Sequence, residues 1–166
     1  MRRLALAFLL LLAQTLGAAA EERVERFHCE LNILADGSMR VAESIDVTVE
    51  GIIIKRGILR TFPMPTDMAV ESVRRDGAPE IYAVSDADGL RELRVGQAEV
   101  YLTHGLHHYD IVYRMTAPII RLPNGDMLIY PVTGTWSFPF QKADITLELP
   151  DGAVIANAMA SVRRVD

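Results

Sequence analysis

Glu43 and the arginines that follow it are the residues whose types and spacing could do chemistry. Glu43 alternates in step with the apolar residues between 39 and 47, so an ideal strand points its carboxylate into the core. An unpaired buried carboxylate costs several kcal/mol, so a partner is expected. Residues 55–60 carry two candidates, Arg56 and Arg60, and either could form a bidentate ion pair with Glu43.

Three roles are open to the cluster of Glu43, Arg56, Gly57 and Arg60. The favoured interpretation is a structural ion pair, with Gly57 allowing a bulge or a close approach of two backbones. Ligand recognition by the same cluster is the second. A catalytic carboxylate is the third, but it would need a second acid or a histidine beside it, and the sequence offers no such constellation. We therefore predict no catalytic residue.

The histidines His104, His107 and His108 invite a metal-site interpretation, because imidazole is a common ligand of transition metals. The spacing argues against it. On a strand, His107 and His108 point to opposite faces, and neither a cysteine pair nor an HExxH motif supports them. We expect exposed histidines at a turn between two strands, and we predict no metal and no cofactor.

An aromatic corner forms the last candidate site. Pro131 and Pro139 cannot donate to a strand ladder, so the segment that contains them is predicted to be an edge or a bulged corner. Its aromatic side chains could offer a platform for a carbohydrate or a peptide, but a plug over the core is the favoured interpretation. The corner consists of Tyr130, Trp136, Phe138 and Phe140.

The elements that position these residues are predicted to be strands. Apolar residues alternate with polar ones over 27–33 and again over 39–49, and Asp36-Gly37 between them is a strong hairpin signal. The same pattern recurs along the chain and gives about eight or nine short strands, without a helical apolar stripe. The predicted fold is all-β, an antiparallel two-sheet β-sandwich of immunoglobulin-like appearance, preceded by an N-terminal signal helix.

The first twenty residues have the layout of a secretory signal peptide. A basic start precedes an apolar run from Leu4 to Leu16, and small residues at Ala18 and Ala20 suit a cleavage site. The run is about 13 residues long, which is short for a membrane span, so cleavage is favoured over permanent anchoring. We predict a signal peptide over 1–20, one domain over 21–166 and an extracytoplasmic location: periplasmic, secreted or membrane-associated.

Composition narrows the class of partner. The formal net charge is −5 and no basic stripe is present, so nucleic acid is not expected as a partner. The single cysteine, Cys29, cannot form an intrachain disulfide, and it falls on the apolar parity of its strand. We expect Cys29 to be a small buried residue in a conventional core.

Short blocks of residues, taken in order, resemble those of a known family. They are the Asp36-Gly37-Ser38 turn, Val41-Ala42-Glu43, Arg56-Gly57-Ile58-Leu59-Arg60, residues 105–113 and residues 128–139. Together they resemble the extracytoplasmic N-terminal domain of the YciQ-like predicted bacterial membrane proteins, known as domain of unknown function 2207, over about 25–150. The resemblance implies an exported β-sandwich followed by transmembrane helices, and it implies no activity, cofactor or catalytic residue.

The predicted function is a non-catalytic binding or interaction domain of the bacterial envelope. A membrane protein or another envelope component is the expected class of partner, and the domain could be the extracytoplasmic part of a membrane complex. The alternative is an envelope hydrolase that acts on cell-wall glycans, which needs two acids about 5–9.5 Å apart across a cleft. Glu43 is the one acid that the strand pattern places oddly, so the second acid is missing.

Overall fold

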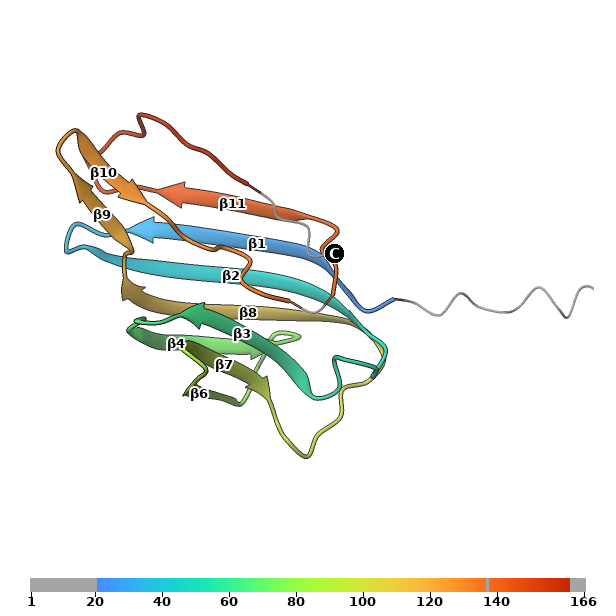
Figure 1. The fold of residues 1–166 in the computed structure, drawn as a ribbon. Coiled ribbons are helices and arrows are strands. Elements are labelled where there is room, and N and C mark those ends of the chain that lie inside the picture. The colour runs from blue at the N-terminus through green and yellow to red at the C-terminus, as the bar shows by residue number, and fades with distance from the viewer. Residues whose placement is uncertain (1–20, 137, 162–166) are drawn as a thin grey trace, which may run out of the picture.

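The structure is a computed structural model that describes residues 21–136 and 138–161. The described part of the chain is built from strands and connecting loops (Figure 1). The strands in chain order are β1 (Arg23–Ile33), β2 (Ser38–Val49), β3 (Gly57–Pro63), β4 (Met68–Arg75), β5 (Ala78–Pro79), β6 (Tyr82–Ala87), β7 (Leu90–Gly96), β8 (Gly105–Thr116), β9 (Ile119–Leu122), β10 (Gly125–Leu128) and β11 (Ala143–Glu148).

These strands form sheets of six, three and two strands. The orders are β11-β1-β2-β8-β4-β5, β3-β7-β6 and β10-β9. The all-β prediction is confirmed, but the arrangement differs from a two-sheet antiparallel sandwich, because a third sheet is present and β11 pairs with β1 in parallel. The immunoglobulin-like arrangement is not confirmed. The predicted signal helix lies outside the described residues.

The hairpin predicted across Asp36-Gly37 is confirmed. β1 and β2 pair antiparallel up to Ile33 and Met39, which are the last partners before the turn. Gly37 has a φ of +84°, a left-handed conformation that glycine adopts without the steric cost of a Cβ. The turn thereby sets the register that places the odd-numbered side chains of β2, including Glu43, and those of β1 from Phe27 onward on the buried face.

The core lies between the six-stranded sheet and the three-stranded sheet that covers part of it (Figure 1). The three-stranded sheet does not reach across the whole inner face. The connection between β10 and β11 crosses in front of β1 and β2 and covers more of that face (Figure 1). Residue Phe140 of this connection packs on Phe27 of β1, with ring centroids 5.9 Å apart. The segment predicted as an edge or a bulged corner is therefore a long connection laid over the core.

Candidate functional site

Glu43 and Arg60 form the ion pair that the sequence predicts. Arg60 Nε donates to Glu43 Oε2 at 2.7 Å, and its NH2 group donates to Oε1 at 2.7 Å, so the contact is bidentate. Both side chains are fully buried, with 0% exposure. Because Glu43 lies on β2 and Arg60 on β3, the pair joins the six-stranded sheet to the three-stranded sheet across the core.

The remaining donors of Arg60 bind the connection that crosses the core. Its guanidinium donates to the backbone carbonyls of Val132 (3.1 Å) and Thr133. Trp136 lies against the same guanidinium, 5.3 Å from ring centroid to Cζ, and its indole N–H donates to the carbonyl of Thr133 at 2.6 Å. Gly134 is required here, because a Cβ at that position would lie 2.9 Å from Arg60 NH1.

Two tyrosines complete the shell around Glu43. The Tyr113 hydroxyl donates to Glu43 Oε1 at 2.8 Å, and the hydroxyls of Tyr113 and Tyr130 lie 2.7 Å apart. Burial, reinforced by the negative charge of Glu43, raises the pKa of both tyrosines. Both hydroxyls therefore keep their protons, and neither can serve as a base at neutral pH.

The ion pair and the aromatic corner, which the sequence presents as two candidate sites, are one cluster. Trp136 packs edge-to-face on Phe138 (5.1 Å) and on Phe140 (5.6 Å), and all three rings are partly buried against the core. Burial alone would lower the pKa of Arg60, but the Glu43 carboxylate outweighs that effect and raises it. Both charged groups of the pair are thus hydrogen-bonded to partners inside the fold.

Arg56 does not join this cluster, although its parity predicts that it could. Gly57 has a φ of +144°, and a Cβ there would lie 1.7 Å from the backbone oxygen of Val95, so two backbones approach closely as predicted. This conformation breaks the strand alternation between positions 56 and 57. The guanidinium of Arg56 turns outward instead, lies over the ring of Tyr101 at 4.6 Å and donates to its hydroxyl at 2.7 Å.

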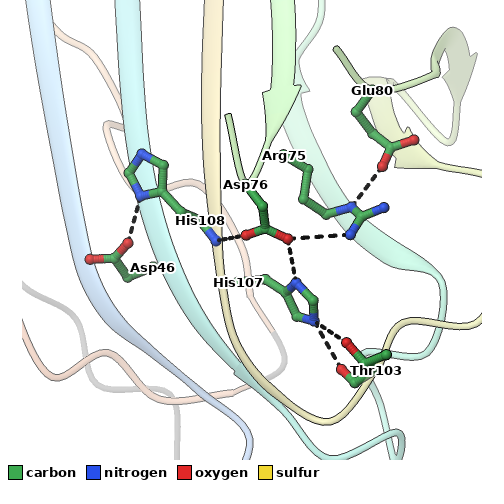
Figure 2. A network of polar contacts seen from close by, with 7 residues as sticks. All are labelled: Asp46, Arg75, Asp76, Glu80, Thr103, His107 and His108. Carbon is green, nitrogen blue, oxygen red and sulfur yellow. Dashed lines mark hydrogen bonds and ion pairs between the residues drawn. The ribbon is translucent and has the colours of Figure 1, made fainter. Parts of the chain in front are cut away.

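The expectation that the histidines are exposed is wrong for His107. This residue is buried on the inner face of β8, and its ring bridges two acceptors (Figure 2). Nδ1 lies 2.7 Å from Asp76 Oδ2, and Nε2 lies 2.9 Å from the carbonyl oxygen of Thr103. The Thr103 hydroxyl also lies 3.5 Å from Nε2, so the ring joins the turn after β4 to the loop before β8.

His108 points to the opposite face of β8, as the strand pattern predicts. Its ring lies between two carboxylates, with Nδ1 2.6 Å from Asp46 and Nε2 3.0 Å from Asp110. The hydrogen bond with Asp46 is the main reason that the pKa of His108 is raised; partial burial opposes it, and Asp110 adds to it. In the described residues, no group of three or more histidine, cysteine or acidic side chains could hold a metal ion.

Asp76 ties these histidines to the turn between β4 and β5 (Figure 2). Its second oxygen accepts the backbone N–H of His108 at 2.9 Å, and Arg75 reaches Asp76 at 3.3 Å and Glu80 at 2.6 Å. Burial alone would raise the pKa of Asp76, but the hydrogen bonds from His108 and His107 lower it. The network fixes a turn against β8, and its rings and carboxylates are already engaged with one another.

Sequence reasoning missed a second buried carboxylate, Glu22. It is 5% exposed and accepts the backbone N–H groups of Glu50, Ile52, Ile53 and Ile54 at 2.6–3.0 Å. Burial alone would raise the pKa of Glu22, but these four hydrogen bonds lower it. Nothing in the sequence identifies the partners, because every residue type except proline has a backbone N–H group.

One shallow hollow lies on the outer face of the six-stranded sheet, opposite the ion pair. Small side chains, Ala42 and Ser44, form its floor between β1 and β8, and polar groups stand around them. Its lining residues also include His28, Glu30, Asp110 and Val112. The hollow does not reach the side chain of Glu43, which points to the buried face.

The fold and the cluster define an all-β domain whose buried charges are partnered within the domain. The chain matches the family described as "Predicted membrane protein (DUF2207) N-terminal domain" over residues 23–163, and it belongs to that family. It is also 30% identical over 139 residues to the uncharacterized protein YciQ of Escherichia coli strain K12. The match covers 77% of this chain and 22% of YciQ, so the chain spans about a fifth of that relative.

Solved structures resemble the chain more distantly. An M1 zinc metallopeptidase from Deinococcus radiodurans aligns with a TM-score of 0.48 at 12% identity, over 76% of this chain and 33% of the peptidase. A putative protease from Parabacteroides distasonis aligns with a TM-score of 0.46 at 15% identity, over 81% and 30% of the two chains. These likenesses are too low to assign an activity.

Among the described residues, no helix has the length and the apolar character needed to cross a membrane.

Proposed function

We propose that this chain is a non-catalytic interaction domain displayed on the extracytoplasmic side of a membrane. The observation that carries the proposal is the complete burial of the Glu43–Arg60 pair. The one acid that the sequence singles out is fully buried, and its two oxygens are occupied by Arg60 and Tyr113. A general acid or a nucleophile must reach its substrate, and Glu43 does not reach the surface.

The extracytoplasmic location is supported by two observations of different kinds. The sequence begins with a basic and apolar segment typical of a secretory signal. The family is described as a predicted membrane protein, and the matching region is its N-terminal domain. An N-terminal domain that follows an export signal is delivered to the outer side of the membrane.

The location is tested by fusing alkaline phosphatase, which is active only after export, to the C-terminus of the full chain. We expect phosphatase activity in intact cells, and we expect its loss in a matched fusion that lacks residues 1–20. A fusion to a fluorescent protein that folds only in the cytoplasm should give the opposite pattern. Strong cytoplasmic fluorescence with an inactive phosphatase would contradict the proposal.

The non-catalytic role is tested against the glycan hydrolase alternative. Dye-labelled cell-wall sacculi are incubated with the purified chain and, as a control, with heat-denatured chain. We expect equal dye release from both samples. Release that requires the folded chain, and that Glu43→Gln leaves unchanged, would indicate a hydrolase whose acids lie elsewhere in the molecule.

A further inference from the structure

Two loops meet at the end of the molecule where β1 begins (Figure 1). They are residues 50–56, between β2 and β3, and residues 97–104, between β7 and β8. The backbone N–H of Leu102 donates to the carbonyl of Lys55 at 2.9 Å, and Arg56 lies over Tyr101. We refer to residues 50–56 and 97–106, which include the first two residues of β8, as the loop end.

The loop end exposes large apolar side chains. Ile52 is 67% exposed and Ile53 is 55% exposed, although neighbouring Ile54 is buried in the core. Tyr101 and Leu106 are each 64% exposed on the adjoining segment. A gathering of exposed apolar side chains marks an interaction surface more often than a single exposed residue does.

Glu22 fixes the conformation of this surface. Its carboxylate accepts the N–H groups of residues 50 and 52–54, so these four donors are hydrogen-bonded internally while the side chains of Ile52 and Ile53 are exposed. Donors that are already satisfied can approach an apolar phase without the cost of being left unpaired.

The side chains beside the tip suit the boundary between lipid and water. Lys55 and Arg56 are exposed next to the two isoleucines, and Tyr101 stacks with Arg56. Tyrosine and basic residues favour the headgroup level, with aliphatic residues deeper. Glu50 and Glu99 also belong to the loop end, so its apolar tip and not a net positive charge would drive the contact.

The family to which the chain belongs is described as a predicted membrane protein, and the loop end lies where the described chain begins. Glu22, the second described residue, is hydrogen-bonded to the tip itself. We therefore propose that the loop end docks on the lipid–water interface of the membrane, with Ile52 and Ile53 at the acyl boundary. This inference rests on the extracytoplasmic role proposed above and names the surface that faces the bilayer.

The test uses an environment-sensitive fluorophore on a single cysteine in the full chain, reconstituted in phosphatidylcholine–phosphatidylglycerol vesicles. Ile53→Cys reports on the tip, and Ile120→Cys is a matched control, because Ile120 is similarly exposed (46%) on β9 at the opposite end of the molecule. The native Cys29 is buried, and burial raises the pKa of its thiol, so it should not be labelled. Unfolding midpoints of both variants confirm that each is folded.

We expect lipids that carry a quencher at a shallow acyl position to quench the label at position 53 roughly twofold or more over the label at 120. Equal quenching at both positions would overturn the docking proposal. A second result would also overturn it: the emission of the label at position 53 shifts as protein concentration rises, but the lipid quenchers have no effect. A second protein molecule would then cover the tip. The phosphatase fusion tests the extracytoplasmic location and does not depend on the quenching result. Failure of the location proposal and failure of the docking proposal can therefore be told apart.

Discussion

Glu43 and Glu22 are both buried carboxylates, yet the molecule satisfies them in opposite ways. Glu43 meets a guanidinium supplied by the facing sheet, and two tyrosines extend the network. Glu22 meets no cation in its hydrogen bonds and is held by four backbone amides of one loop. The first arrangement joins two layers of the fold, whereas the second sets the shape of a surface loop.

The difference shows how a buried charge acts on its surroundings. A bidentate ion pair draws side chains inward, and around Glu43 the aromatic corner and the crossing connection close over it. Backbone amides converge on Glu22 and leave the attached side chains free to point outward, as Ile52 and Ile53 do. The cluster around Glu43 therefore holds the core together, whereas Glu22 holds a loop that keeps apolar side chains at the surface.

Removing the carboxylate of Glu43 should have the largest effect. Glu43→Ala leaves Arg60 charged and unpaired in the core, and such a loss costs about 3–5 kcal/mol of unfolding free energy. Glu43→Gln should cost less, because the amide oxygen can still accept a hydrogen bond from Arg60. Urea unfolding of the purified variants measures both values, and a wild-type midpoint for Glu43→Ala would remove the contrast between the two carboxylates.

Glu30→Ala is the surface control for this measurement, with an expected change within about 0.5 kcal/mol. Its side chain is 61% exposed. Glu80 would be a poor control, although its position in the sequence resembles a surface site. Its side chain is 7% exposed and bonds to Arg75, so its removal also breaks a partly buried pair.

Gly57→Ala should follow in size, because it forces β3, the strand that carries Arg60, away from β7 of the same sheet. The Cβ would meet the Val95 carbonyl at 1.7 Å, in addition to the backbone strain at a φ of +144°. We expect a loss of about 2–4 kcal/mol from strain and overpacking together. Gly77→Ala isolates the strain, since φ is +81° there and no atom lies within 4 Å. Equal losses in thermal or urea unfolding would show that the close approach is unimportant.

Glu22→Gln should cost less than either change, about 1–3 kcal/mol, because several amides lose a charged acceptor but no cation is stranded. Amide hydrogen exchange should accelerate at residues 50 and 52–54 and stay unchanged at Glu43. The pKa of Glu22 is lowered in the folded state, so its contribution is present above the unfolded pKa of about 4.5 and is lost as pH falls through the folded value. A variant with the same acid unfolding profile as the wild type would contradict this assignment.

The smallest expected effect belongs to His108, a partly exposed histidine between two carboxylates. Its pKa is raised in the folded state, so its contribution is fully present below the unfolded pKa of about 6.5 and is lost as pH rises through the folded value. Solvent screening should keep the effect below about 1 kcal/mol. His108→Gln should remove this part of the stability–pH curve, as measured by urea unfolding between mildly acidic and mildly alkaline pH. An unchanged curve would exclude His108 as its source.

The sequence predicts most of the strands. For each candidate site it predicts some of the residues but not all of their partners. Period-two alternation locates Glu43 on the inner face, and Asp36-Gly37 marks the hairpin that positions it, because both signals are local. The choice of Arg60 over Arg56 could not be predicted in the same way. It depends on the conformation of Gly57, which is imposed by β7 from a distant part of the chain.

The sequence by itself determined the all-β character, the inward carboxylate of Glu43 and the membrane-protein family of this chain. Each rests on neighbouring residues or on short blocks in order, which a linear sequence records. Only the tertiary structure decided that the aromatic corner covers the ion pair, that His107 is buried, and that Glu22 shapes an exposed loop. These contacts join residues that are far apart in the chain, and their partners include backbone groups, which have no signature in the amino-acid sequence.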